Sequence, residues 1–116
     1  MEFNDNKPIY RQIVDYAYNR IIDRGWLQSE KIPSVRELAA DLGVNTRTVM
    51  KAFEDLQDAG IIVPRRGMGF YLADDAVSRV TEARRREFFT STVPRLREEM
   101  ARLGITPADL LRYLDQ

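Results

Sequence analysis

Polar and basic side chains gather in two short stretches of this sequence, and the chemistry of the first suits recognition of a nucleic-acid duplex. It holds Asn45, Thr46, Arg47, Thr48 and Lys51. An arginine can donate two parallel hydrogen bonds to O6 and N7 of guanine, and a threonine can bind phosphate or contact a thymine methyl group. Arg47 is the best candidate for a base contact, because no acidic residue lies one helical turn away from it.

The second stretch is a basic and glycine-rich segment made of Arg65, Arg66, Gly67, Met68 and Gly69. Two adjacent arginines suit insertion into a narrow and strongly negative minor groove, and the glycines allow close backbone approach. The arginines could instead protect a sheet edge from pairing with another strand. Because the segment follows the first stretch so closely, we favour groove binding.

Catalytic and metal-binding chemistry has few residues to use in this chain. The sequence holds neither Cys nor His. Disulfides, thiolate or imidazole metal sites, and nucleophiles activated by histidine are therefore excluded. No convergent set of acids, bases or metal ligands appears either. We expect no enzymatic activity and no cofactor.

The formal charge is balanced, with 18 basic and 18 acidic residues. The distribution of charge is more informative than its sum. The basic residues that fall where the chain would meet DNA are Arg36, Arg47, Lys51, Arg65 and Arg66. This pattern indicates a polar protein with one basic face, not a nonspecific nucleic-acid coat.

No targeting signal is expected at the start of the sequence. Residues 1–6 are acidic and polar, unlike the charged and then apolar pattern of a signal peptide. No apolar run approaches membrane-spanning length. We therefore expect a cytoplasmic location and no membrane association.

Two short helices joined by a tight turn are expected to position the first stretch. Ser34 and Glu37 form a capping box that starts one helix, and Gly43 supplies the left-handed residue that ends it. Asn45 caps the next helix, expected over 46–59, whose inward residues are Val49, Ala52, Phe53 and Leu56. In such a helix-turn-helix the first turn of the second helix enters the major groove.

Several of these residues have a second interpretation. Ser34 and Asn45 are needed as caps whatever the protein binds, so DNA contact would be an added role. Arg36 would fix the register on the DNA backbone or touch a base, or else lean on a neighbouring carboxylate. Lys51 could be a solvated charge paired with Asp55 at i+4.

The runs 61–63 and 70–72 are rich in β-prone residues and flank the second stretch. They predict a hairpin whose glycine-rich tip is 65–69. Pro64 marks an edge or a bend, because proline cannot donate to a strand ladder.

A scaffold helix is expected from Pro8 to about Arg24, since proline suits a first helical position. Its apolar stripe consists of Ile9, Ile13, Tyr16, Ala17 and Ile21. Gly25 should end the helix, and Trp26 and Leu27 should fold back against the core. Trp26 could also be a stacking platform, although packing is the more common role of a lone tryptophan.

After the hairpin, the sequence predicts a helix over 77–103, bent or broken by Pro94, and a second helix over 107–114 capped at Thr106. Ile105 could pack on Leu110 as a hydrophobic staple. These 41 residues, 76–116, are too few for a separate ligand-binding core. The apolar residues of this tail are Phe88, Phe89, Val93, Leu96, Met100, Leu103, Ile105, Leu110, Leu111 and Leu114.

Such a tail cannot bury its apolar surface alone. It packs either on the preceding helix-turn-helix and hairpin, which together make a winged domain, or on another copy. We favour another copy, and therefore a homodimer. The Arg84-Arg85-Arg86 run is interpreted as a solvated helix face, and the alternative is an added role in contact with DNA or with a second chain.

Five motifs, in this order, resemble the DNA-binding domain of GntR-type bacterial transcription regulators. They are Pro8-Ile9-Tyr10-Arg11-Gln12-Ile13, residues 32–39, Gly43-Val44-Asn45, Thr48-Val49 and Arg65-Arg66-Gly67-Met68-Gly69. The sequence departs from the common family pattern at Gln28-Ser29 and at Thr46-Arg47, so its base preference cannot be copied from relatives.

The resemblance implies DNA contacts for Arg36, Arg47, Thr48 and the Arg66-Gly67 tip. It also implies phosphate contacts for Lys7 and Tyr10 at the start of the first helix. The short tail resembles that of the YtrA-like subfamily, whose compact helical tail serves dimerisation in place of an effector domain. The tail thus agrees with a homodimer.

Taken together, the sequence predicts a mainly α protein with a small β-hairpin. Residues 1–75 would form a winged helix-turn-helix domain and residues 76–116 a two-helix dimerisation tail. The predicted function is sequence-specific regulation of transcription, as a homodimeric repressor on an inverted-repeat operator. The alternative is a winged helix used for protein–protein contact, without a specific DNA site.

Overall fold

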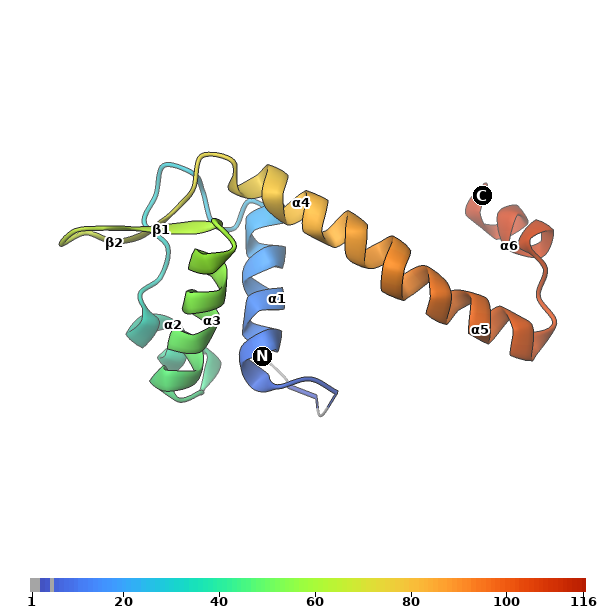
Figure 1. The fold of residues 1–116 in the computed structure, drawn as a ribbon, viewed down its shortest axis with the longest axis horizontal. Helices are drawn as coiled ribbons and strands as arrows, with labels where there is room; N and C mark the ends of the chain where they lie inside the picture. Colours follow the sequence, from blue (N-terminus) through green and yellow to red (C-terminus); the bar gives the residue numbers. More distant parts are fainter. Residues whose placement is uncertain (1–2, 5) are drawn as a thin grey trace. The chain divides into compact units, whose positions relative to one another are not determined.

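The computed structural model describes residues 3–4 and 6–116. The elements in chain order are α1 (Ile9–Ile22), α2 (Val35–Leu42), α3 (Thr46–Asp58), β1 (Ile62–Arg65), β2 (Gly69–Leu72), α4 (Ala76–Glu87), the π-helical turn η1 (Phe88–Thr92), α5 (Val93–Leu103) and α6 (Pro107–Leu114) (Figure 1). The predicted fold class, mainly helical with one small hairpin, is confirmed.

The chain divides into two compact units, one ending at Thr81 and the other spanning Glu82–Gln116. The sequence suggested a division after residue 75, where the hairpin ends. The first unit reaches further because Ala76 and Val80, on the first turns of α4, are fully buried in its core.

The core of the first unit lies among α1, α2 and α3, where α1 and α3 run side by side (Figure 1). The four inward residues predicted for α3 are all buried. The ring of Phe53 meets that of Phe70 edge-on, with centroids 5.2 Å apart, which ties α3 to the hairpin. In contrast, Ile9 is 44% exposed and does not belong to the buried stripe of α1.

The end of α1 differs from the prediction. The helix ends at Ile22, before Arg24 and Gly25, and Arg24 takes the left-handed conformation at φ 64°. Its Nη1 donates to the carbonyl oxygens of Ile21 and Ile22 at 3.3 and 3.1 Å, which satisfies acceptors of the last turn. A Cβ at position 25 would meet the Arg20 guanidinium, which is the end of a flexible side chain and can move aside.

The segment after α1 contains one buried and one exposed apolar side chain. Trp26 is buried and its ring meets that of Tyr16 edge-on, with centroids 6.3 Å apart. This confirms the packing role of the tryptophan. The same prediction is wrong for Leu27, which is 43% exposed.

The paired strands of the hairpin extend further toward its tip than the sequence indicated. Its antiparallel register pairs Ile62 with Leu72 and continues to Arg65 opposite Gly69, so Pro64 lies inside β1. Arg65 and Gly69 therefore close the strand ladder, and the tip consists of Arg66, Gly67 and Met68. The Met68 N–H donates to the Arg65 carbonyl at 2.8 Å, and Gly67 takes the left-handed conformation at φ 73°.

Gln12 is the buried polar side chain of α1, at 6% exposed. Its Nε2 donates to the carbonyl oxygens of Asn4 and Lys7 at 2.7 and 2.9 Å, and its Oε1 accepts from the Asn4 N–H at 3.0 Å. These three bonds fix the path by which the chain enters α1. They tie Asn4 and Lys7 to the first turn of α1.

The second unit is built from consecutive helical segments. The interruption expected at Pro94 is present as η1, in which the Val93 N–H bonds to the Phe88 carbonyl five residues back. Pro94 follows in the first turn of α5, where its missing N–H is tolerated. Thr106 and Asp109 form a capping box at the start of α6, as predicted for Thr106. The Ile105–Leu110 staple stays a prediction.

Among the described residues, none of the helices combines the length and the apolar character that crossing a bilayer requires.

Candidate nucleic-acid interface

The turn between α2 and α3 is fixed by local hydrogen bonds. The Glu37 N–H donates to Ser34 Oγ at 3.1 Å, and the Ser34 N–H donates to Glu37 Oε1 at 3.2 Å, which is the predicted capping box. Gly43 ends α2 at φ 68°. Asn45 Oδ1 accepts from the Arg47 N–H at 2.8 Å and so caps α3. The turn therefore holds the first residues of α3 in a defined conformation.

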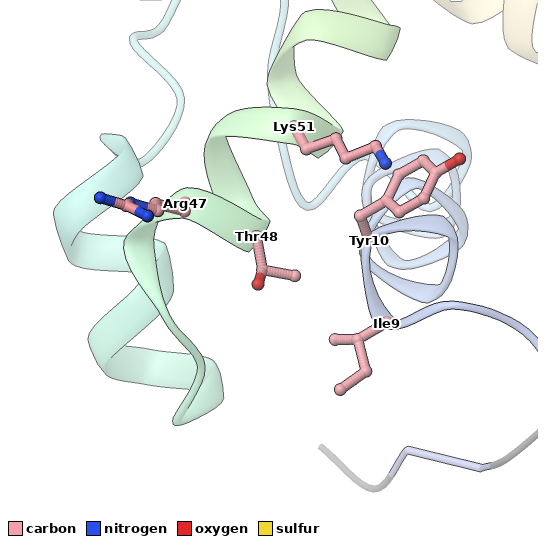
Figure 2. Close-up of a pocket in the computed structure, with 5 residues that line it drawn as sticks. All are labelled: Ile9, Tyr10, Arg47, Thr48 and Lys51. Atoms are coloured by element: carbon pink, nitrogen blue, oxygen red, sulfur yellow. The ribbon is translucent and has the colours of Figure 1, made fainter.

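The first turn of α3 points most of its side chains outward. Asn45, Thr46 and Arg47 are exposed, whereas Thr48 is half-buried beside the fully buried Val49. Figure 2 shows the Arg47 side chain directed away from Tyr10 and Lys51. The buried face thus anchors the helix while Arg47 is presented to a partner.

A shallow depression of about 410 Å³ lies between the start of α1 and α3. It is lined by Ile9, Tyr10, Arg47, Thr48 and Lys51 (Figure 2). None of these five side chains is a carboxylate, and two of them are cations. Within the described part of the chain, no group of three acidic side chains could hold a metal ion.

The Lys51 ammonium lies over the ring of Tyr10, 4.1 Å from its centroid. Figure 2 shows the lysine reaching toward α1, whereas the alternative interpretation paired it with Asp55 along its own helix. Lys7, the other basic residue assigned to this end of α1, forms an ion pair with Asp15 at 2.9 Å. The structure thus brings Tyr10, Thr48 and Lys51 together and holds Lys7 against a carboxylate.

The two arginines of the hairpin differ in their surroundings. The Arg65 guanidinium stacks over the Tyr71 ring, 4.1 Å from its centroid, whereas Arg66 is exposed at the tip beside Gly67. The role of the tip residues in DNA binding stays a prediction, as it does for the exposed Arg36 on α2.

Lys31 is a basic residue at the hairpin that the sequence did not indicate. It forms an isolated bridge with Tyr71, and its side chain runs so close to Gly69 that a Cβ there would lie 2.8 Å from Lys31 Cε. Glycine suits this position because its φ is 89°, a left-handed conformation that other residues rarely adopt. No local pattern could have shown the contact, because the two residues meet only in the folded chain.

Met50 is a second residue near the candidate interface that was not among the predicted DNA contacts. It is 44% exposed and lies three positions after Arg47, on the same face of α3. A methionine on this face could contact a thymine methyl group. The signal was available in the sequence, because Met50 falls outside the apolar stripe of α3 that faces the core.

The apolar residues of the tail are all accessible within a single chain. Val93, Met100 and Leu110 are half-buried, and the other seven predicted residues are exposed. Phe88 and Phe89 meet edge-on with centroids 5.1 Å apart. Contact of this surface with a second copy stays a prediction.

Acid is expected to weaken the start of α2. The Ser34 backbone N–H, with help from the Ser34 side chain, holds the pKa of Glu37 below its usual value. A carboxylate with a lowered pKa stabilises the fold above its unfolded pKa, and this contribution is lost as the pH falls through the folded pKa. At pH 6 we expect the wild type to melt at a higher temperature than Glu37→Gln. As the pH is lowered to 3, this difference in melting temperature should shrink.

Thermal unfolding of both proteins, followed by circular dichroism, measures this gap. A gap that stays constant across the whole range would contradict the role of the carboxylate in the capping box.

Comparison with known proteins places this geometry in a family. Residues 9–72 match the model described as bacterial regulatory proteins, gntR family. The chain is 36% identical over 77 residues to the HTH-type transcriptional repressor YtrA of Bacillus subtilis, a match that covers 66% of this chain and 59% of the relative.

Two solved structures are similar as well. A GntR family transcriptional regulator from Listeria monocytogenes has 34% sequence identity and a TM-score of 0.78, covering 97% of each chain. The DNA-binding domain of AraR, in complex with the operator ORR3, has 29% identity and a TM-score of 0.56, covering 63% of this chain and 88% of that one.

Proposed function

Because the chain belongs to the GntR family of bacterial regulatory proteins and is a DNA-binding transcription regulator, we propose that it acts as a homodimeric repressor on an inverted-repeat operator. The observation that carries this proposal is the exposed first turn of α3. Arg47 is presented there on a helix anchored by the buried Val49 and Phe53. A helix supported in this way can enter the major groove without disturbing the core.

Arg47 would read a guanine by donating to O6 and N7, while Thr46 and Thr48 contact phosphate or a thymine methyl group. Arg36 on α2 would fix the register on the DNA backbone. The tip of the hairpin would insert Arg66 into the adjacent minor groove, where Gly67 permits close approach. The AraR domain bound to its operator supports duplex DNA as the partner of this fold.

The tail would join two copies. Its apolar side chains, among them Phe89, Leu96 and Leu103, are exposed in the single chain. A two-fold symmetric dimer presents two copies of α3 in opposite directions, which matches the symmetry of an inverted repeat. The exposed apolar surface thus supports the dimer, and the two-fold symmetry of the dimer in turn predicts an inverted-repeat operator.

Repression would follow from occupation of a promoter by the dimer. The similar Bacillus subtilis protein YtrA is named a transcriptional repressor. Since bacterial chromosomal DNA lies in the cytoplasm, the proposed function places the chain there, and it requires neither a cofactor nor catalysis.

Selection of binding sites from a random duplex library tests the proposal directly. With the purified chain at near-physiological salt, we expect enrichment of an inverted repeat whose half-sites are centred about 34–36 Å apart or at a multiple of that spacing. An enriched site without two-fold symmetry would contradict the dimer. A lack of any enrichment, also at low salt, would favour a winged helix that binds another protein.

A further inference from the structure

We propose that the depression between α1 and α3 binds one backbone phosphate of the DNA through the Lys51 ammonium. Tyr10 is then a positioning residue, because its ring holds this ammonium in place. This inference rests on the proposed function, since it names how one phosphate of the operator is bound. The ring of Tyr10 would hold the lysine, and its hydroxyl would make no contact with DNA.

The Tyr10 ring and the Lys51 ammonium form a close pair between α1 and α3. Tyr10 is half-buried and packs against the core of the first unit, so its ring is held in place. The Lys51 ammonium lies 4.1 Å from the ring centroid, and the Arg11 guanidinium lies farther away, at 5.9 Å. A cation over an aromatic face is attracted by the ring quadrupole. The exposed lysine therefore has a preferred position instead of sampling many rotamers.

The contact with the ring leaves the lysine free to bind an anion. An ammonium has three N–H donors, and attraction to the face of a ring need not use all of them. A lysine that is already placed loses less side-chain entropy when it binds than a freely moving one. The ring of Tyr10 would thus strengthen a phosphate contact that the ring itself does not make.

The lining of the depression suits an anion. Lys51 supplies positive charge, Thr48 supplies a hydroxyl, and no lining residue is a carboxylate. Asp15, the acidic residue on the following turn of α1, is paired with Lys7 at 2.9 Å. The apolar side chain of Ile9 completes the lining and suits contact with a deoxyribose. A phosphodiester presents this combination of negative charge and apolar sugar.

The depression also lies beside the residues proposed to read bases. Thr48 and Lys51 follow Arg47 on the same helix, and Figure 2 shows Arg47 pointing away from the Tyr10–Lys51 pair. One helix would therefore hold a base with one side chain and a flanking phosphate with another. The phosphate contact would fix register without contributing to sequence preference.

The experiment compares four variants of the full chain on the operator selected by the wild type. They are Lys51→Met, Tyr10→Leu, Tyr10→Phe and the Tyr10→Leu, Lys51→Met double variant. Affinity is measured at several salt concentrations, because each lost phosphate contact lowers the slope of log K against log [salt] by about 0.9. Arg20→Met, at the far end of α1, is the charge-matched control, and melting temperatures verify that each variant is folded.

We expect Lys51→Met to weaken binding about tenfold per half-site for all sequences and to lower the salt slope by about 1 per half-site, hence by about 2 for a dimer on an inverted repeat. Tyr10→Leu should weaken binding several-fold without changing sequence preference, and Tyr10→Phe should bind like the wild type. The double variant should bind like Lys51→Met alone, because the ring would have no lysine left to position. Arg20→Met should keep the wild-type slope.

Three results would overturn the proposal while the wild type still binds its operator. One is an unchanged salt slope in Lys51→Met. Another is a Tyr10→Phe variant as weak as Tyr10→Leu, which would mean that the hydroxyl contacts DNA itself. The third is additive losses in the double variant, which would make Tyr10 independent of Lys51. Failure of the wild type to bind any selected duplex would refute the proposed function and this inference together.

Discussion

The variant that carries both Phe89→Asp and Leu96→Asp is expected to be monomeric in solution. The proposed dimer interface would bury both side chains, which are 60% and 39% exposed in the single chain. An aspartate buried there without a partner must lose its hydration or be protonated, and either process costs several kcal/mol. Two such changes per copy should weaken association by at least about a thousandfold.

The loss of the dimer should also be visible on DNA. When two half-sites are bound by linked domains, the second contact profits from a high effective concentration, which raises the overall affinity by about 10²–10⁴. We expect the variant with Phe89→Asp and Leu96→Asp to lose most of this gain in affinity. Its individual winged domain should remain folded, because the two positions lie outside the first unit.

Analytical ultracentrifugation and operator titration measure the two effects. A matched control is Ser91→Asp with Ala101→Asp, which adds the same charge to helical positions off the apolar stripe of the tail. We expect this control to stay dimeric. A double Phe89→Asp, Leu96→Asp variant that still sediments as a dimer would rule out the tail as the dimer interface.

Replacement of Arg47 by alanine is expected to weaken operator binding by roughly 1–3 kcal/mol for each half-site and to relax the preference at one base pair. The loss follows from two hydrogen bonds that alanine cannot replace. The fold should be unaffected, because the Arg47 side chain is exposed and the Asn45 cap bonds to its backbone N–H instead.

Repeating the site selection with Arg47→Ala shows whether a base preference disappears, and titration at fixed salt gives the loss in affinity. Arg20→Ala removes the same charge from the far end of α1 and should change neither result. If Arg47→Ala kept both the affinity and the preference of the wild type, the assignment of α3 as the recognition helix would be wrong.

Features that depend on neighbouring residues could be predicted from the sequence. The capping boxes at Ser34 and Thr106 and the left-handed Gly43 are defined by hydrogen bonds within one turn. The buried face of α3 follows from helical periodicity. These local rules were sufficient to place the first turn of α3, which carries the candidate base contact Arg47.

Features that depend on the folded chain could not be predicted in the same way. Arg24, which is not a glycine, takes the left-handed conformation after α1, and its own guanidinium donates to carbonyls of the last turn. The ladder extends to Arg65 and Gly69 because the tip needs only three residues to turn. The Lys51–Tyr10 contact joins two helices, and neither residue indicates its partner in sequence.

Because the apolar side chains of the tail are exposed in a single chain, the occupancy of the operator should depend on protein concentration. None of the side chains in 81–116, all of which the structure describes, is buried within one chain. If association supplies the missing burial, the fraction of dimer depends on total protein concentration. At low abundance the number of dimers rises with the square of the number of chains. A twofold change in expression would then change operator occupancy by up to about fourfold, a steeper dose response than a monomeric regulator gives.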